Sequence, residues 1–181
     1  MIYFTSDHHF GHANVIRHCD RPFTSVEEMD EALISNWNNT VTPTDDIYIL
    51  GDFTMRPAAE AYNYLSRLNG RKYFIKGNHD RFLKNTKLYD GVFEWVKDYH
   101  VLRHDGHKIV LFHYPIAEWD GYFRGAIHLY GHIHNSQKSN DRASNWLAFN
   151  VGVDVNELKP VSMDEIIQKA KVIQSYLSPS K

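Results

Sequence analysis

Short apolar runs that each end in glycine, aspartate or histidine are the feature that most limits how this chain can fold. The run that ends at Lys76 is followed directly by Gly77-Asn78-His79-Asp80. Glycine allows a sharp turn, so three polar side chains come at once after an apolar strand. Four other runs end in the same way, at Asp7-His8-His9, Gly51-Asp52, His113 and Gly131-His132-Ile133-His134. Ligands gather at strand ends in α/β folds, so the pattern predicts one site built from five loops.

The first half of the chain alternates between strand-like and helix-like segments. A Thr24-Ser25 pair followed by glutamates predicts a helix start, and Met29, Leu33 and Trp37 recur on one helical face. This alternation implies right-handed crossovers and a mostly parallel sheet. Strands are predicted over residues 1–5, 47–50 and 72–75, and helices over 14–19, 26–38 and 58–68.

The second half is rich in strands. Asp105-Gly106 is a hairpin turn signal, and we expect the flanking His104 and His107 to be exposed. We expect an α/β fold, a four-layer sandwich in which two mixed β-sheets pack face to face and are flanked by helices. Residues 1–181 are expected to form a single domain with a frayed tail from about residue 177. Strands are predicted over 92–96, 99–102, 108–112, 126–130 and 147–153, and a closing helix over 162–176.

Composition excludes several classes of function. The formal net charge is -2, which argues against a nucleic-acid polymer as partner because such binding usually shows a basic excess. Cys19 is the one cysteine, so neither an internal disulfide nor a thiolate zinc site can form, which suits a reducing cytoplasm. We see no signal peptide in residues 1–10 and no apolar run near the ~18 residues of a membrane span. A cytoplasmic location without a membrane partner is therefore expected.

The loops at the strand ends offer a set of oxygen and imidazole nitrogen ligands. Their number is too large for one ion and suits two, and two ions about 3.5–4 Å apart are a known device for phosphoryl hydrolysis. One aspartate must then bridge the ions, and His132 and His134, two residues apart, can each reach a different ion. The seven predicted ligands are Asp7, His9, Asp52, Asn78, His113, His132 and His134.

Several neighbouring residues have two interpretations each. His79, next to Asn78, is the candidate proton donor to a leaving group. His12 and Arg17 either contact a substrate phosphate or belong to a helix start on the surface. His8 points away from Asp7 and His9 in an extended chain, so we expect it to be solvated or to pack. The loop from Tyr114 to Arg124 is rich in aromatic residues and forms a pocket wall, a lid or a dimer contact.

These motifs resemble those of the calcineurin-like metallophosphoesterases in order and spacing, over about residues 1–153. The resemblance is closest to the short bacterial and phage-type members without a cap domain. It implies a double β-sandwich with two divalent transition metal ions, manganese first, with iron, zinc and nickel as alternatives. It further implies that Asp7, His9 and His134 hold one metal, that Asp52 bridges, that Asn78, His113 and His132 hold the other, and that His79 is the proton donor.

One stretch departs from the protein phosphatases of this family. In those enzymes Gly-Asp is followed by a second aspartate and an arginine. Here Arg56 matches the phosphate-binding arginine, or is an exposed loop residue, while Met55 replaces the aspartate that orients the catalytic histidine. The protein-phosphatase interpretation is weakened, and Asp80 and His12 become the candidates to orient His79.

We therefore expect metal-dependent hydrolysis of a small phosphodiester or nucleotide-type substrate by metal-activated hydroxide, with His79 as proton donor. The alternatives are a phosphomonoesterase or protein phosphatase of the same fold, and a binding scaffold without catalysis. A nuclease is disfavoured by the net charge of -2. The expected partner is a small phosphoester substrate, and the sequence indicates no oligomeric state.

Overall fold

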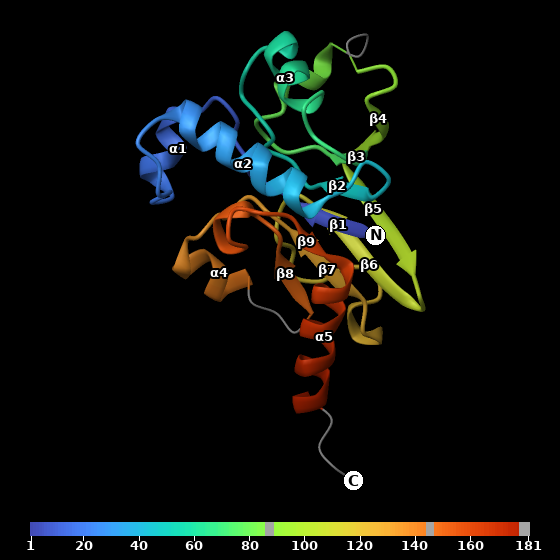
Figure 1. Cartoon of the computed structure of the whole chain (residues 1–181). Helices are drawn as coiled ribbons and strands as arrows, with labels where there is room; N and C mark the ends of the chain where they lie inside the picture. The colour runs from blue at the N-terminus through green and yellow to red at the C-terminus, as the bar shows by residue number, and fades with distance from the viewer. Residues whose placement is uncertain (86–88, 144–146, 178–181) are drawn as a thin grey trace.

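Two β-sheets pack against each other at the centre of the computed structural model, with helices outside them (Figure 1). The structure describes residues 1–85, 89–143 and 147–177. The predicted frayed tail therefore lies, apart from residue 177, outside the described residues. No helix in the described part of the chain is long and apolar enough to cross a membrane.

The first sheet carries the three strands predicted in the first half of the chain. Its order is β4-β3-β2-β1-β9, with β1 to β4 parallel and β9 antiparallel to β1. The predicted mostly parallel sheet is confirmed, whereas the two-residue β9 was not predicted because it is too short to show a pattern. The strands are β1 (Ile2–Thr5), β2 (Asp46–Ile49), β3 (Arg71–Ile75), β4 (Phe93–Lys97) and β9 (Val161–Ser162).

The second sheet has the order β5-β6-β7-β8. The predicted hairpin joins β5 and β6, and both Asp105 and Gly106 adopt the left-handed conformation that such a turn requires, with φ of 44° and 79°. His104 and His107 pair across it and are only partly exposed. The strands are β5 (Tyr99–His104), β6 (His107–Phe112), β7 (Ile127–Tyr130) and β8 (Ala148–Asn150), with β6, β7 and β8 parallel.

The helices begin largely where the capping residues predict. Ser25 accepts a hydrogen bond from the Glu28 amide at 3.1 Å, and Ser162 accepts one from the Glu165 amide at 3.2 Å. The short polar α4 was not predicted, because its sequence has no apolar periodicity. The helices are α1 (Ala13–His18), α2 (Val26–Thr40), α3 (Ala58–Leu65), α4 (Gln137–Ala143) and α5 (Met163–Leu177), and the 3-10 segments are η1 (Arg81–Lys84), η3 (Tyr122–Arg124) and η4 (Val153–Val155).

Two apolar clusters hold the layers together. One lies between the first sheet and helices α2 and α3, and Trp37, Phe53 and Phe74 are among its members. The other joins the facing sides of the two sheets, and contains Phe4 from β1 and Leu129 from β7. The expected pair of mixed sheets with flanking helices is therefore confirmed.

Backbone hydrogen bonds continue past the strand ends and tie the loops together. The Asp7 amide donates to the Gly51 carbonyl at 3.0 Å, and the Gly131 amide donates to the His113 carbonyl at 2.9 Å. These bonds belong to the loops that follow β1, β2, β6 and β7. The polar loops predicted from the sequence therefore meet at one edge of the sandwich.

Substitution of Phe53 tests how much the apolar cluster beneath these loops contributes to stability. Its side chain is fully buried and its ring contacts those of Phe10, Phe74 and Phe82. We expect Phe53→Ala to lower the free energy of unfolding by ~3–5 kcal/mol, because the lost contacts leave a cavity. Chemical denaturation in the presence of a chelator measures this difference.

Phe123→Ala is the matched control, because Phe123 is 80% exposed. We expect it to change the free energy of unfolding by less than about 0.5 kcal/mol. Equal effects of the two substitutions would contradict this account of the core.

Candidate dinuclear metal centre

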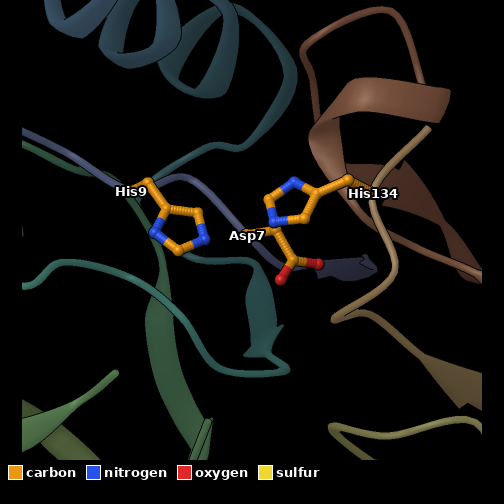
Figure 2. Close-up of side chains that lie close together, drawn as sticks. All are labelled: Asp7, His9 and His134. Carbon is orange, nitrogen blue, oxygen red and sulfur yellow. The ribbon is translucent and has the colours of Figure 1, made fainter. Parts of the chain in front are cut away.

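Two groups of potential metal ligands lie side by side at the loop edge. The first consists of Asp7, His9 and His134, and Figure 2 shows their side chains converging from the loops that follow β1 and β7. Its three potential ligand atoms, one from each residue, lie within 4.8 Å of one another, and the same holds for the second group. The second group consists of Asp52, His113 and His132. The division of the histidines between the groups is the one that the family resemblance implies.

Asp52 lies between the two groups. Its Oδ2 atom is 3.7 Å from His9 Nε2 and 3.5 Å from His113 Nε2. Asn78 adjoins the second group, because its Oδ1 atom is 3.1 Å from His113 Nε2. The structure thus brings all seven predicted ligands together, and Asp52 has the position that a bridging carboxylate requires.

The ligand loops are conformationally strained. A left-handed backbone is uncommon outside glycine and costs on the order of 1–3 kcal/mol per residue. Such strain gathers at functional sites, where it aims side chains that a relaxed loop would point elsewhere. Five of the predicted ligands have this conformation: Asp7 at φ 59°, His9 at 52°, Asp52 at 50°, His132 at 71° and His134 at 46°.

Two glycines allow the backbone to approach the carboxylates closely. A Cβ atom on Gly77 would lie 2.3 Å from Asp52 Oδ1, and one on Gly131 would lie 2.4 Å from Asp7 Oδ2. Neither distance is compatible with a side chain. These two positions, which the sequence pattern singled out, must therefore be glycine because the carboxylates leave no room for a side chain.

His9 shows most directly that the site fits a cation. Its side chain is buried, and within the described residues neither ring nitrogen has a hydrogen-bond partner. Burial lowers the pKa of His9 to about 3, so the ring is neutral and offers a free lone pair. An unsatisfied buried polar group costs ~1–3 kcal/mol, a cost that a coordinated ion removes.

The two carboxylates differ in their electrostatic environment. Burial raises the pKa of Asp7. Burial also opposes the ionisation of Asp52, but hydrogen bonding and attraction from His113, and the amide of His79, outweigh it and hold the pKa of Asp52 at about 2. The Asp52 carboxylate therefore stays charged, as a group between two cations must.

Hydrogen bonds on the far side of two histidines fix which nitrogen faces the site. His113 Nδ1 donates to the Leu50 carbonyl at 2.7 Å, which leaves Nε2 toward Asp52. His134 Nδ1 lies 2.6 Å from Asp154 Oδ2. Such outer partners orient metal-binding histidines and raise their basicity. All seven donors are carboxylate or amide oxygens and imidazole nitrogens, which suit two divalent ions.

Asp154 and Arg21 are functional residues that the sequence analysis missed. Arg21 Nε donates to Asp154 Oδ1 at 2.7 Å, and both side chains are 1% exposed. The same guanidinium donates at 2.7 Å to the carbonyls of Asp7 and His8. The pair therefore links His134 to the backbone of the β1 loop. The available signal was that Asp154 follows a strand and a glycine, as the predicted ligands do. It was not recognised because the predicted strand extended to residue 153.

Cys19 also lies near this pair. Cys19, His134 and Asp154 form a third group of potential ligands within 4.8 Å. Both oxygens of Asp154 are already engaged by Arg21 and His134. We therefore assign Asp154 to positioning His134 rather than to holding an ion of its own.

The remaining predicted residues lie at different distances from the centre. The His12 ring is 5.6 Å from the His9 ring, so His12 borders the site. Arg56 pairs with Glu60 at 3.0 Å and packs along Gly11. Arg17 is exposed on α1, and none of the described contacts joins it to the two groups. His8 is buried, contacts Thr5 and stacks on Phe10, which confirms the packing interpretation.

His79 stands at the mouth of the centre. Its Nε2 is 3.9 Å from Asp52 Oδ2, its amide donates to Asp52 Oδ1 at 2.9 Å, and its side chain is 39% exposed. Asp80 and His12 were the two candidates to orient this ring, and none of the described hydrogen bonds joins the Asp80 carboxylate to it. The Asp80 carboxylate instead accepts hydrogen bonds from the amides of Asp52, Phe53 and Gly77, which tie the two loops together.

The aromatic loop contributes one residue to the site. The Tyr114 hydroxyl is 3.3 Å from Asn78 Oδ1, and its ring is 4.6 Å from that of His132. Trp119 is buried and donates to the Ala126 carbonyl, while Phe123 is exposed. Of the three interpretations of this loop, the pocket wall applies to Tyr114, which borders the metal centre, whereas Trp119 packs in the core.

Comparison with known proteins agrees with this geometry. A family model for the calcineurin-like phosphoesterase superfamily domain matches residues 1–161. Protein MJ1445 of Methanocaldococcus jannaschii is 38% identical over 181 residues, covering 96% of this chain and 95% of that protein. The Gene 66 protein of Mycobacterium phage D29 is 30% identical over 202 residues, covering 97% and 98%. A protein of unknown function from Aquifex aeolicus, AQ665, has a solved structure with a TM-score of 0.74 and 28% identity, covering 93% of this chain and 98% of that one.

The chain belongs to the calcineurin-like phosphoesterase superfamily. It is a hydrolase that acts on phosphoester bonds and depends on divalent metal ions. The resemblance noted in the sequence is thereby confirmed, as is the fold that it implies.

Substitution of Gly77 tests the close approach to Asp52. We expect Gly77→Ala to displace Asp52 and to lower the bound metal from two equivalents to one or none, because the new methyl group overlaps the Asp52 backbone and carboxylate. Metal analysis after dialysis gives the stoichiometry. Gly106→Ala is the control, since Gly106 also has a positive φ but has open space around it. Full metal content in Gly77→Ala would contradict this account of the site.

Asp154→Asn tests the positioning of His134. We expect metal affinity to fall about 10- to 100-fold at one of the two sites, because outer-sphere partners of ligating histidines contribute that much. Calorimetric titration of the chelator-treated protein measures the affinities. Asp164→Asn, at an exposed position of α5, should leave them unchanged. Unaltered affinity in Asp154→Asn would show that Asp154 only packs.

Proposed function

We propose that the chain hydrolyses a small phosphodiester of nucleotide type, and that His79 donates a proton to the leaving group. The observation that carries this proposal is the position of His79 beside Asp52. Three other predicted ligands, His9, His113 and His132, lie next to Asp52, whereas His79 keeps 39% of its side chain exposed. A group that transfers a proton to substrate needs this access.

Bound divalent ions would lower the pKa of water and neutralise the charge of the phosphoryl group. Manganese is our first choice for these ions, with iron, zinc or nickel as alternatives, because the donors are oxygen and imidazole. Asp7, His9 and His134 would hold one ion, and Asn78, His113 and His132 the other, with Asp52 shared between them.

The protein's own residues then have distinct tasks. The hydrogen bond from the His79 amide to Asp52 keeps the His79 loop in register with the ligands. The exposed imidazole of His79 holds the proton that the departing alkoxide takes up. His12 and Tyr114 border the mouth and would contact the substrate there.

Two features favour a diester over a monoester. A monoester phosphate carries an extra charge, which enzymes commonly meet with a free guanidinium. Here Arg56 is paired with Glu60 at 3.0 Å. Met55 also stands where the protein phosphatases of this family have an aspartate, and Met55 is exposed and cannot orient His79 through a charge.

Turnover of nitrophenyl esters tests this proposal. With two manganese equivalents bound, we expect the protein to cleave bis-nitrophenyl phosphate faster than nitrophenyl phosphate. His79→Ala should lower kcat for the diester by about 10²- to 10⁴-fold and leave the metal content unchanged, because the proton donor is lost while the ligands remain. His104→Ala, in the β5–β6 hairpin, is the matched control.

The outcomes separate the rival functions. Faster cleavage of the monoester would favour a phosphatase. No cleavage of either ester by protein with two bound metal ions would favour a binding scaffold. Full activity of His79→Ala would show that His79 is not the proton donor.

A further inference from the structure

An open cavity of about 270 Å³ lies beside the loops of the metal centre. One wall is formed by residues 55–58, which follow Asp52 in the chain, and the other by Arg81, Phe82 and Lys84, which follow His79. Both walls are therefore continuations of loops that carry reaction-centre residues. The cavity is large enough for a phosphate and part of a sugar, since one water occupies about 30 Å³.

The fold presents two cations together on one wall. Arg81 and Lys84 are the first and last residues of η1, and residues three apart lie on the same side of a 3-10 helix. Phe82 is buried between them and contacts the rings of Phe53, Phe74 and Tyr89, so it anchors the segment. The Arg81 amide donates to the His79 carbonyl at 2.7 Å. The two cations are thus carried by an ordered turn.

The cavity has an excess of positive charge. Arg56 on the opposite wall is paired with Glu60. Among residues 1–85, 89–143 and 147–177, no carboxylate lies within ion-pair distance of Arg81 or Lys84, and both side chains are exposed. The whole chain has a formal net charge of -2, so the positive charge at this cavity does not follow from the overall charge.

The cavity is close to the reaction centre. Arg81 is two residues from His79, so their Cα atoms are at most about 7 Å apart. Arg56 packs against Gly11, which lies between His9 and His12, and a Cβ atom on Gly11 would be 2.8 Å from Arg56 Cγ. A ligand bridging the metal centre and this cavity needs only the length of a small nucleotide.

We propose that this cavity is a subsite for a second phosphate group of the substrate, separate from the phosphoryl group that is hydrolysed. The substrate is then a small phosphodiester that also carries a phosphate elsewhere, and this assignment rests on the proposed function. A guanidinium binds two phosphate oxygens at once, and the lysine adds a point charge. The exposed side chain of Met55 also lines the cavity and suits the sugar that carries the phosphate.

Paired substrates test the subsite. The probes are the nitrophenyl ester of thymidine 5'-phosphate with and without a 3'-phosphate. We expect the 3'-phosphate to lower KM about tenfold in the natural protein at low salt, and less at high salt because exposed charges are screened. The KM ratio is the KM of the ester without the 3'-phosphate divided by the KM of the ester with it. Arg81→Ala and Lys84→Ala should each reduce this ratio about threefold, which corresponds to the free energy of one exposed ion pair. Lys171→Ala, on the exposed face of α5, removes the same charge and should leave the ratio unchanged.

The subsite and the proposed function fail in different ways. A KM ratio near one in the natural protein, or a ratio that survives in the Arg81→Ala/Lys84→Ala double variant, would overturn the subsite. If neither ester is cleaved, the proposed function fails, and calorimetric binding of thymidine 5'-phosphate against thymidine 3',5'-bisphosphate replaces KM. Equal affinities for these two would then overturn the subsite, and tighter binding of the bisphosphate that is lost in the double variant would support it.

Discussion

The carboxylate of Asp52 is the constraint on which the rest of the site depends. It stands at the end of β2, within 4 Å of histidines from three other loops, and accepts the amide of His79. Gly77 must lack a side chain for Asp52 to lie there, and Asp80 holds the amides of both loops in place. The proposed proton donor, the candidate bridging ligand and the loop that carries η1 are therefore positioned by one set of contacts.

This arrangement is costly in the absence of a cation. It combines a left-handed backbone at five ligands, buried carboxylates, and a histidine with no hydrogen-bond partner among the described residues. The two apolar clusters offset that cost by holding the sheets, while Arg21 and Asp154 secure the loops after β1 and β7. Such a site persists because its surroundings are rigid, and bound ions offset part of its unfavourable free energy.

Much of the site could be predicted because the relevant signal is local. Each ligand follows an apolar strand directly, and parallel strands bring their ends to one edge, so order along the chain was sufficient to assemble Asp7, Asp52 and Asn78. Residues that act through distant partners could not be found this way. Arg21 and Asp154 are 133 positions apart, and Arg21 lies in what the sequence shows only as a turn. The role of Asp80 in joining two loops could not be predicted, because its backbone partners depend on how those loops meet. The polar α4 carries no apolar period by which it could be recognised.

The most direct test of the account is where metal binds. Anomalous diffraction from crystals soaked in manganese locates each ion independently of activity. The account predicts two peaks about 3.5–4 Å apart on either side of the Asp52 carboxylate. One peak should lie by Asp7, His9 and His134, and the other by Asn78, His113 and His132. A single peak, or an ion held by Cys19, His134 and Asp154, would contradict the assignment of Asp52 as the shared ligand.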